Sequence, residues 1–146
     1  MMGHPRVIGY LQRSVSHEFN AAQQYTLQAV HAESWGMKDL ARRLRGDARE
    51  ELEHAEAFIG QLLRLGVTPY TAQPRAPRVG RTHVELVRFG METEEEAMRL
   101  YDEAARFCEQ IGDAANAAVF SRILADEVNH FQQLEREWQA LTAKRA

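Results

Sequence analysis

Apolar residues recur at intervals of three and four positions along four long stretches of the chain, which is the pattern of one face of an α-helix. Glycine and proline separate these stretches at Trp35-Gly36, over the proline-rich segment 66–82, and at Gly112-Asp113. The pattern predicts four helices in a single domain that spans residues 1–146. Their expected bounds are 5–33, 37–65, 83–111 and 114–142. A helix of about 28 residues is about 42 Å long, which is typical of a helix bundle.

The lengths of the connections predict how the helices are arranged. The first and third connections have only a few residues, so each joins an antiparallel helical hairpin. The segment 66–82 could reach about 56 Å when extended, which is enough to cross the whole length of a bundle. We therefore predict an all-α, ferritin-like four-helix bundle in which a long crossover joins two antiparallel hairpins. The alternative is a disordered linker between two separate hairpins.

Each predicted helix carries one glutamate within its apolar stripe, near the middle of the helix. These glutamates are Glu18, Glu51, Glu94 and Glu127. Two histidines, on the same helix faces as the second and fourth glutamates, follow them by three residues: His54 and His130. Burial of an unpaired carboxylate costs several kcal/mol, and four together would repel one another. No lysine or arginine lies in the middle of these stripes, so two divalent metal ions are the expected partners.

The spacing of these residues repeats along the chain. Glu18 precedes Glu51 by 33 residues, and Glu94 precedes Glu127 by the same number. The two Glu-x-x-His motifs are 76 residues apart, and so are Tyr25 and Tyr101. One such motif is common by chance in a glutamate-rich helix, but two with matched partners favour a dinuclear site shared by two pseudo-symmetric hairpins. A satisfied polar layer without metal is the alternative.

The types of ligand narrow the choice of metal. Carboxylates and imidazoles without thiolates suit iron or manganese, and zinc can occupy such sites too. Four glutamates balance the charge of two divalent ions. We expect two iron ions per subunit, with manganese or zinc as alternatives.

Five short segments carry a likeness to a known family. They are Val7-Ile8-Gly9-Tyr10-Leu11, Gln24-Tyr25, Trp35-Gly36, Glu51 with His54, and Asp126-Glu127 with His130. Through them, and over nearly its whole length, the chain resembles a bacterioferritin. The resemblance implies a cytoplasmic iron-storage protein that forms hollow 24-subunit shells and oxidises Fe(II) with O2 or H2O2 at a ferroxidase site inside each bundle.

The resemblance also assigns roles to residues of the site. It implies that Glu51 and Glu127 bridge two metal ions, that Glu18 and Glu94 are terminal ligands, and that each histidine binds one ion. Tyr25 matches a tyrosine that supplies an electron during oxidation in the family, and packing on its core stripe is the alternative role.

Two departures from the family pattern change these expectations. Leu52 stands where the family has the methionine that ligates haem, so we expect no haem. The chain ends at Ala146, without the short fifth helix that lines the fourfold channels of the family's shells. We therefore expect a homo-oligomer that is at least a dimer and could be a 24-subunit shell. Co-assembly with a haem-binding subunit remains open.

Composition and charge exclude several classes of protein. The 18 basic and 21 acidic side chains give a net charge of −3 without a basic block, so no nucleic-acid partner is expected. No stretch approaches about 18 uninterrupted apolar residues, so no membrane partner is expected. The first residues do not form a signal-peptide core, and Cys108 is the single cysteine, so we expect a cytoplasmic protein.

Three functions compete at this point. The leading one is oxidation of Fe(II) to Fe(III) for iron storage and detoxification. The alternative is a non-storing di-iron oxidoreductase, a peroxidase or small-molecule oxidase, that acts as a dimer. The single cysteine argues against a rubrerythrin-type peroxidase within this second class. A metal-free interaction bundle is the third, and the inward-facing carboxylates argue against it.

The remaining aromatic and histidine residues are interpreted as structural. Tyr101, the symmetry mate of Tyr25, is expected to be a core packing residue, and Cys108 a small buried hydrophobe. Four histidines lack carboxylates at a matching spacing and are expected at the surface or at helix caps: His4, His17, His31 and His83.

Overall fold

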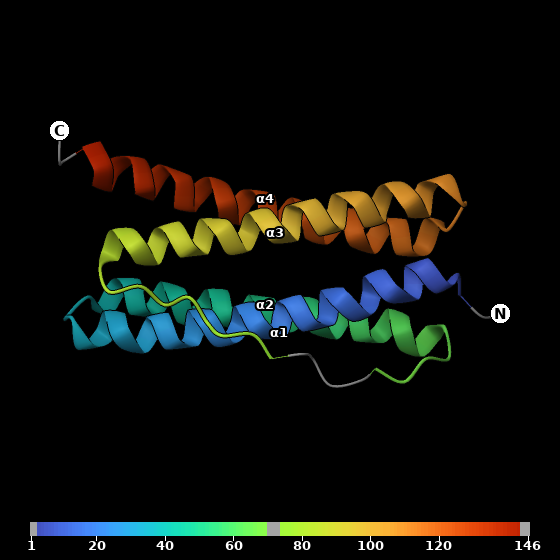
Figure 1. Cartoon of the computed structure of the whole chain (residues 1–146), viewed down its shortest axis with the longest axis horizontal. Coiled ribbons are helices and arrows are strands. Elements are labelled where there is room, and N and C mark those ends of the chain that lie inside the picture. The colour runs from blue at the N-terminus through green and yellow to red at the C-terminus, as the bar shows by residue number, and fades with distance from the viewer. Residues whose placement is uncertain (1–2, 70–73, 144–146) are drawn as a thin grey trace.

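The computed structural model of the chain describes residues 3–69 and 74–143. It contains four helices, α1 (Pro5–Ser34), α2 (Lys38–Arg64), α3 (His83–Gln110) and α4 (Ala114–Ala143), and no strand in the residues described. Helix α1 pairs with α2 and α3 with α4 as antiparallel hairpins, and the hairpins meet with α1 against α3 and α2 against α4 (Figure 1). The predicted all-α four-helix bundle is confirmed.

The connection between α2 and α3 crosses from one end of the bundle to the other. Its residues 74–82 run along α1, and α2 and α3 run in the same direction (Figure 1). Of the predicted crossover 66–82, residues 70–73 lie outside the described part of the chain. Gln28 on α1 donates hydrogen bonds to the carbonyl oxygens of Arg78 and Val79, at 3.2 and 3.1 Å. The two hairpins form one bundle, so the alternative of two separate hairpins is wrong.

Local sequence explains where the helices begin. The Thr82 hydroxyl accepts a hydrogen bond from the Glu85 amide at the start of α3, and the Asp113 carboxylate accepts one from the Asn116 amide at the start of α4, both at 3.2 Å. The Glu85 carboxylate accepts from the Arg81 amide at 2.9 Å, so the second half of the capping box reaches one residue further back than usual. The helix ends differ from the predicted ones by at most one residue.

Glycine ends the first helix of each hairpin. Gly36 and Gly112 have φ angles of 80° and 75°, in the left-handed region that glycine adopts without steric cost. In both turns the next amide bonds back into the helix, from Met37 to the Ala32 carbonyl at 2.9 Å and from Asp113 to the Cys108 carbonyl at 2.8 Å. This is the Schellman arrangement, which satisfies carbonyl groups left open at the helix end and makes the tight reversal possible.

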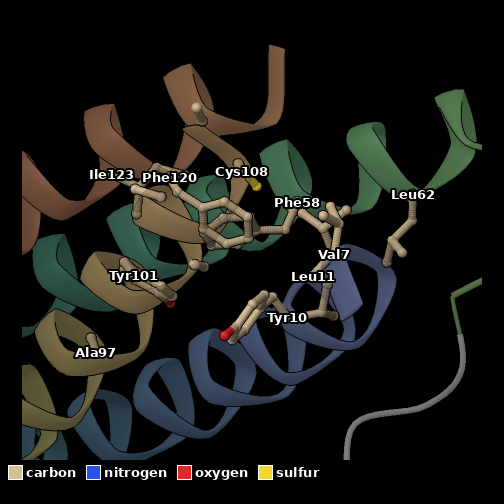
Figure 2. Close-up of a cluster of buried hydrophobic side chains, with 14 residues drawn as sticks. Val7, Tyr10, Leu11, Phe58, Leu62, Ala97, Tyr101, Cys108, Phe120 and Ile123 are labelled. Atoms are coloured by element: carbon tan, nitrogen blue, oxygen red, sulfur yellow. The ribbon is translucent and has the colours of Figure 1, made fainter. Parts of the chain in front are cut away.

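The hydrophobic core is divided into two clusters. One fills the end of the bundle where α1 begins and is rich in large side chains such as Phe58, Tyr101 and Phe120 (Figure 2). The other fills the opposite end and includes Leu44 and Leu86. The four glutamates of the interrupted stripes lie between the clusters along their helices, so each apolar cluster supports one side of a buried polar layer. None of the described helices has both the length and the apolarity to cross a membrane.

Candidate metal centre

The polar layer brings together six side chains from all four helices. Glu18 comes from α1, Glu94 from α3, and one Glu-x-x-His pair from each of α2 and α4. All four carboxylates are at most 1% exposed, and both imidazoles are buried. The heptad position of each glutamate explains this placement, because it puts the carboxylate on the face that packs against the other helices.

Their ligand atoms form two overlapping groups. One group contains Glu18, Glu51, His54 and Glu127, and the other contains Glu51, Glu94, Glu127 and His130. Within each group the atoms lie within 4.8 Å of one another. Glu51 and Glu127 belong to both groups, whereas each of the other four residues belongs to one. The arrangement therefore has the form of two adjacent ion sites with two shared carboxylates.

Hydrogen bonding distinguishes the shared carboxylates from the others. Within the described residues, neither oxygen of Glu51 and neither oxygen of Glu127 has a hydrogen-bond partner, although all four atoms are buried. Glu18 and Glu94 each have one such oxygen, Oε2, while their Oε1 atoms accept hydrogen bonds from tyrosines. Buried carboxylate oxygens without partners are costly, and bound cations would supply the missing partners. The donor set therefore fits two metal ions.

Each histidine points its Nδ1 atom into the polar layer. Nδ1 of His54 lies 3.3 Å from carboxylate oxygens of both Glu51 and Glu127, and Nδ1 of His130 lies 3.1 Å from Glu94. On the outer side, Nε2 of His54 lies 3.0 Å from Asp126, and Nε2 of His130 lies 3.2 Å from Asp47. A carboxylate behind a metal-binding imidazole fixes the ring and its tautomer.

The two outer aspartates were not among the predicted site residues. Asp47 lies four residues before Glu51 on the same face of α2, and Asp126 directly precedes Glu127. Their spacing from the glutamates was visible in the sequence. Their pairing with histidines of the opposite hairpin was not, because it depends on the register of α2 against α4.

Burial and mutual repulsion dominate the electrostatics of the carboxylates. Burial, together with the neighbouring glutamates, raises the pKa of Glu51 and of Glu127 well above the usual range. Burial alone would also raise the pKa of Glu94. Its contacts with His130, Glu127 and Tyr25 outweigh burial, so the pKa of Glu94 is lowered. Without metal, burial and repulsion therefore disfavour the ionised form of the two shared carboxylates, whereas the ionised form of Glu94 is favoured.

The pKa values of both histidines are raised. Burial alone would lower the pKa of His54, but its contacts with Glu127 and Glu18 outweigh burial and raise that pKa to about 11. Contacts with Asp47 and Glu94 likewise outweigh burial at His130 and raise its pKa to about 11. Without metal, both rings are imidazolium ions at neutral pH, and their protons must leave before Nδ1 can bind a cation.

Two tyrosines complete the polar layer. The Tyr25 hydroxyl donates a hydrogen bond to Glu94 Oε1 at 2.5 Å, and the Tyr101 hydroxyl donates one to Glu18 Oε1 at 2.6 Å. Burial, followed by the nearby carboxylates, raises the pKa of both phenols well above the usual value. Tyr101 is buried as expected, but the interpretation of it as packing alone is incomplete. Its 76-residue offset from Tyr25 was the signal for the second contact.

Two of the remaining histidines differ from expectation. His83 is only part-buried, and its Nε2 lies 2.6 Å from Glu137 Oε1, so it has a carboxylate partner on α4. His17 is also part-buried, and its ring packs edge-on against Tyr101 with 6.3 Å between centroids. His4 does cap a helix, because its Nδ1 accepts a hydrogen bond from the Arg6 amide at 3.0 Å.

A polar hollow of about 330 Å³ adjoins the centre at His54. Glu50 and Asp126 line it, and their carboxylate oxygens approach the outer nitrogen of His54 closely enough to form a third, more exposed group of possible metal ligands. Arg49 and Arg122 line the same hollow, so acidic and basic side chains together surround this approach to His54.

The chain is similar to known proteins along nearly all of its sequence. Residues 8–142 match the family model described as a ferritin-like domain. The bacterioferritin of Rhodobacter capsulatus is 29% identical over 137 residues, which cover 94% of this chain and 85% of the relative. The bacterioferritin of Mycolicibacterium paratuberculosis is 31% identical over 137 residues, which cover 94% of this chain and 86% of the relative.

Solved structures share the arrangement of the helices. The Rhodobacter capsulatus bacterioferritin superposes with a TM-score of 0.94 at 28% identity, over 98% of this chain and 89% of that one. That structure has a metal-free dinuclear site and a haem iron in a crystallographic special position. The Mycobacterium tuberculosis bacterioferritin gives the same TM-score of 0.94 at 26% identity, over 98% of this chain and 90% of that one.

Proposed function

We propose a function for this chain on the ground that it belongs to the bacterioferritin family. The protein binds two Fe(II) ions inside each bundle and oxidises them to Fe(III), as the first step of iron storage and detoxification. One observation carries the proposal. Six buried carboxylate oxygens of the polar layer have no hydrogen-bond partner among the described residues, and they belong to four glutamates that face two imidazole nitrogens.

The hydrogen-bond pattern supports separate roles for the glutamates. We assign Glu51 and Glu127 as bridges, because both oxygens of each are available and each belongs to both groups. Glu18 and Glu94 have one available oxygen each and serve as terminal ligands. His54 and His130 complete one ion site each through Nδ1. Four carboxylates neutralise two Fe(II) ions. The ions therefore remove the repulsion among the buried carboxylates of the metal-free centre.

The chain's own groups manage protons and electrons around the iron. Entry of Fe(II) displaces the protons of the imidazoles. Asp126 keeps its hydrogen bond with Nε2 of His54, and Asp47 stays 3.2 Å from Nε2 of His130, so that each ring is held in place. O2 or H2O2 accepts the electrons of Fe(II). Tyr25 supplies a further electron, and Glu94 is placed to receive its proton along the 2.5 Å hydrogen bond.

Assembly decides whether the oxidised iron is stored. Bacterioferritins are iron-handling proteins that form oligomers. We propose that this chain also forms a homo-oligomer in the cytoplasm, and that a closed shell of 24 subunits is the form that stores Fe(III). A dimer without a cavity would be the form of a non-storing oxidase.

The position of Leu52 supports a haem-free protein. Leu52 directly follows Glu51 on α2, and its side chain is 43% exposed, so it faces away from the polar layer. A leucine has no lone pair for iron, whereas haem iron takes donors such as methionine, histidine or cysteine. We therefore propose that this chain differs in its haem content from the Rhodobacter capsulatus relative.

The test is an aerobic titration of the metal-free protein with Fe(II), with oxidation followed after each addition. Wild type is compared with Glu51→Gln, which removes one proposed bridge, and with Glu56→Gln, an exposed glutamate on the same helix. We expect fast oxidation in wild type and in the Glu56→Gln control, and none above the protein-free rate in Glu51→Gln.

The amount of iron taken up separates the possible outcomes. Uptake that continues to tens of soluble irons per chain supports storage in a cavity. Saturation near two irons per chain would support the non-storing oxidase instead. No oxidation above the protein-free rate in wild type would contradict both iron functions.

A further inference from the structure

The two buried tyrosines form a reciprocal pair across the polar layer. Tyr25 follows Glu18 by seven residues on α1, and its hydroxyl donates to Glu94 on α3 at 2.5 Å. Tyr101 follows Glu94 by seven residues on α3, and its hydroxyl donates to Glu18 on α1 at 2.6 Å. Each tyrosine therefore bonds the terminal carboxylate of the opposite hairpin, and the two ion sites have the same phenol–carboxylate contact.

Packing accounts for the ring of Tyr101 but not for its hydroxyl. The ring lies in the larger core cluster, with centroids 5.2 Å from Phe58 and 6.2 Å from Phe120 (Figure 2). Both neighbours fill the same cluster without a polar atom. The hydroxyl of Tyr101 instead reaches the carboxylate of Glu18, which is completely buried. A phenylalanine would fill the cluster equally well, so the oxygen calls for a second explanation.

We propose that Tyr101 is a second electron-donating tyrosine, equivalent to Tyr25, so that this centre can reduce O2 completely in one turnover. The inference rests on the proposed ferroxidase function and deepens it. Oxidation of a buried phenol requires that a proton leave with the electron. Glu18 Oε1 is within hydrogen-bond distance to receive the proton of Tyr101, as Glu94 Oε1 is for Tyr25.

The electrons and protons balance with two tyrosines. Reduction of one O2 to two water molecules takes four electrons and four protons. Two Fe(II) ions give two electrons as they become Fe(III). Tyr25 and Tyr101 each give one electron and one proton as they become neutral tyrosyl radicals, and solvent supplies the other two protons. Three electrons are available with one tyrosine, and two are available with neither, which leaves H2O2 as the product.

The experiment compares the tyrosines one at a time. Metal-free wild type, Tyr25→Phe, Tyr101→Phe and the double variant each receive two Fe(II) per chain, are mixed with O2 and are frozen at short times. Electron paramagnetic resonance counts tyrosyl radicals, with ring-deuterated tyrosine to identify them, and a peroxidase assay measures released H2O2. Tyr10→Phe is the matched control, because Tyr10 lies in the same cluster but donates to Glu103 at 2.6 Å rather than to a residue of the centre.

We expect each single variant to give about half of the wild-type radical signal, and the double variant to give none and to release H2O2. The Tyr10→Phe control should match wild type. Zn(II) binding by Tyr101→Phe should also match wild type, because Zn(II) tests the ligands without redox chemistry.

Three results would count against the inference. A wild-type radical yield and no H2O2 in Tyr101→Phe would show that the residue is a packing residue. Loss of Zn(II) binding in Tyr101→Phe would make it a positioning residue for Glu18 instead of an electron donor. Failure of wild type to oxidise Fe(II) above the protein-free rate would overturn the proposed function itself and is recognised before any variant is compared.

Discussion

His54 Nε2 lies 3.0 Å from Asp126 Oδ2, and this contact turns Nδ1 of the same ring toward Glu51 and Glu127. Asp47 stands in the same relation to His130, at 3.2 Å from its Nε2. The two aspartates come from the helices opposite their histidines, so each pair also ties α2 to α4. The orientation of both proposed imidazole ligands therefore depends on residues that need not touch the metal.

We predict that Asp126→Asn weakens binding of one of two Zn(II) ions per chain by roughly 10- to 100-fold, because the imidazole loses its fixed orientation and part of its basicity. Competition with a coloured chelator at neutral pH measures the two affinities. Asp39→Asn is the matched control, since the Asp39 side chain is 96% exposed on α2. Unchanged Zn(II) affinity in Asp126→Asn would contradict the role of Asp126 in orienting the His54 ring.

We further predict that Glu51→Gln makes the metal-free protein more stable while it removes metal binding. Burial and the neighbouring glutamates raise the pKa of Glu51 well above its usual range, so the carboxylate is unfavourable without a cation. An uncharged amide of the same shape should raise the free energy of unfolding by about 1–2 kcal/mol at neutral pH. Urea denaturation of the chelator-treated protein measures the change.

The exposed Glu56→Gln variant serves as the comparison for this prediction, and its stability should stay within about 0.5 kcal/mol of wild type. A metal-free Glu51→Gln protein less stable than wild type would mean that the carboxylate already has a favourable partner in the polar layer.

Much of this arrangement follows from the sequence. A glutamate at a core heptad position must point between the helices, and the repeated 33-residue offset brings Glu18 beside Glu51 and Glu94 beside Glu127 once each hairpin closes. The tight turn at Gly36 and the helix cap at Thr82 also follow from the sequence, because neighbouring residues determine the backbone conformations that they need. Local rules therefore account for the helices and for the burial of the four glutamates.

Contacts between the hairpins could not be predicted in the same way. The bonds from Tyr25 to Glu94 and from His54 to Asp126 join residues 69 and 72 positions apart, and they depend on how far one helix slides along another. Heptad spacing gives the face of a helix but not this register. His83 illustrates the same limit, because its carboxylate partner Glu137 lies 54 positions away on α4.

The protonation of the centre predicts how stability depends on pH. Contacts with carboxylates, which outweigh burial, raise the pKa of His54 and of His130 to about 11 in the folded protein, against about 6.5 for an unfolded chain. A group whose pKa is raised by folding contributes its full stabilisation below its unfolded-state pKa. This contribution is lost as the pH rises toward its folded-state pKa. Glu51 and Glu127, whose pKa values are raised mainly by burial, act in the same direction.

We therefore expect the melting temperature of the metal-free protein to fall by roughly 5 °C or more between pH 7 and pH 9. Saturating Zn(II) should remove most of this fall, because the imidazoles are then deprotonated at both pH values. Differential scanning calorimetry of both forms tests the expectation. A metal-free melting temperature that rises over this interval would contradict the proposed charge state of the two histidines. Glu94, whose pKa is lowered, changes stability only in acid, outside this window.

The last prediction concerns haem. Leu52 and Leu63 are both exposed leucines on α2, at 43% and 60%. If Leu52 occupies the position of a haem-ligating methionine, Leu52→Met should bind haem through its thioether sulfur, at about one haem per two chains when two copies face each other. The wild-type protein and the Leu63→Met control should bind none. The pyridine haemochrome assay after reconstitution with haemin measures the content.

Haem bound equally by wild type and by Leu52→Met would show that a residue other than position 52 holds the iron, and the proposal of a haem-free protein would then be wrong. Haem bound by Leu63→Met but not by Leu52→Met would place the contact between two copies further along α2. The expected result, binding in Leu52→Met alone, would show that a single apolar side chain separates this protein from a haem-binding one. It would also show that the face of α2 carrying Leu52 meets a second copy of the chain.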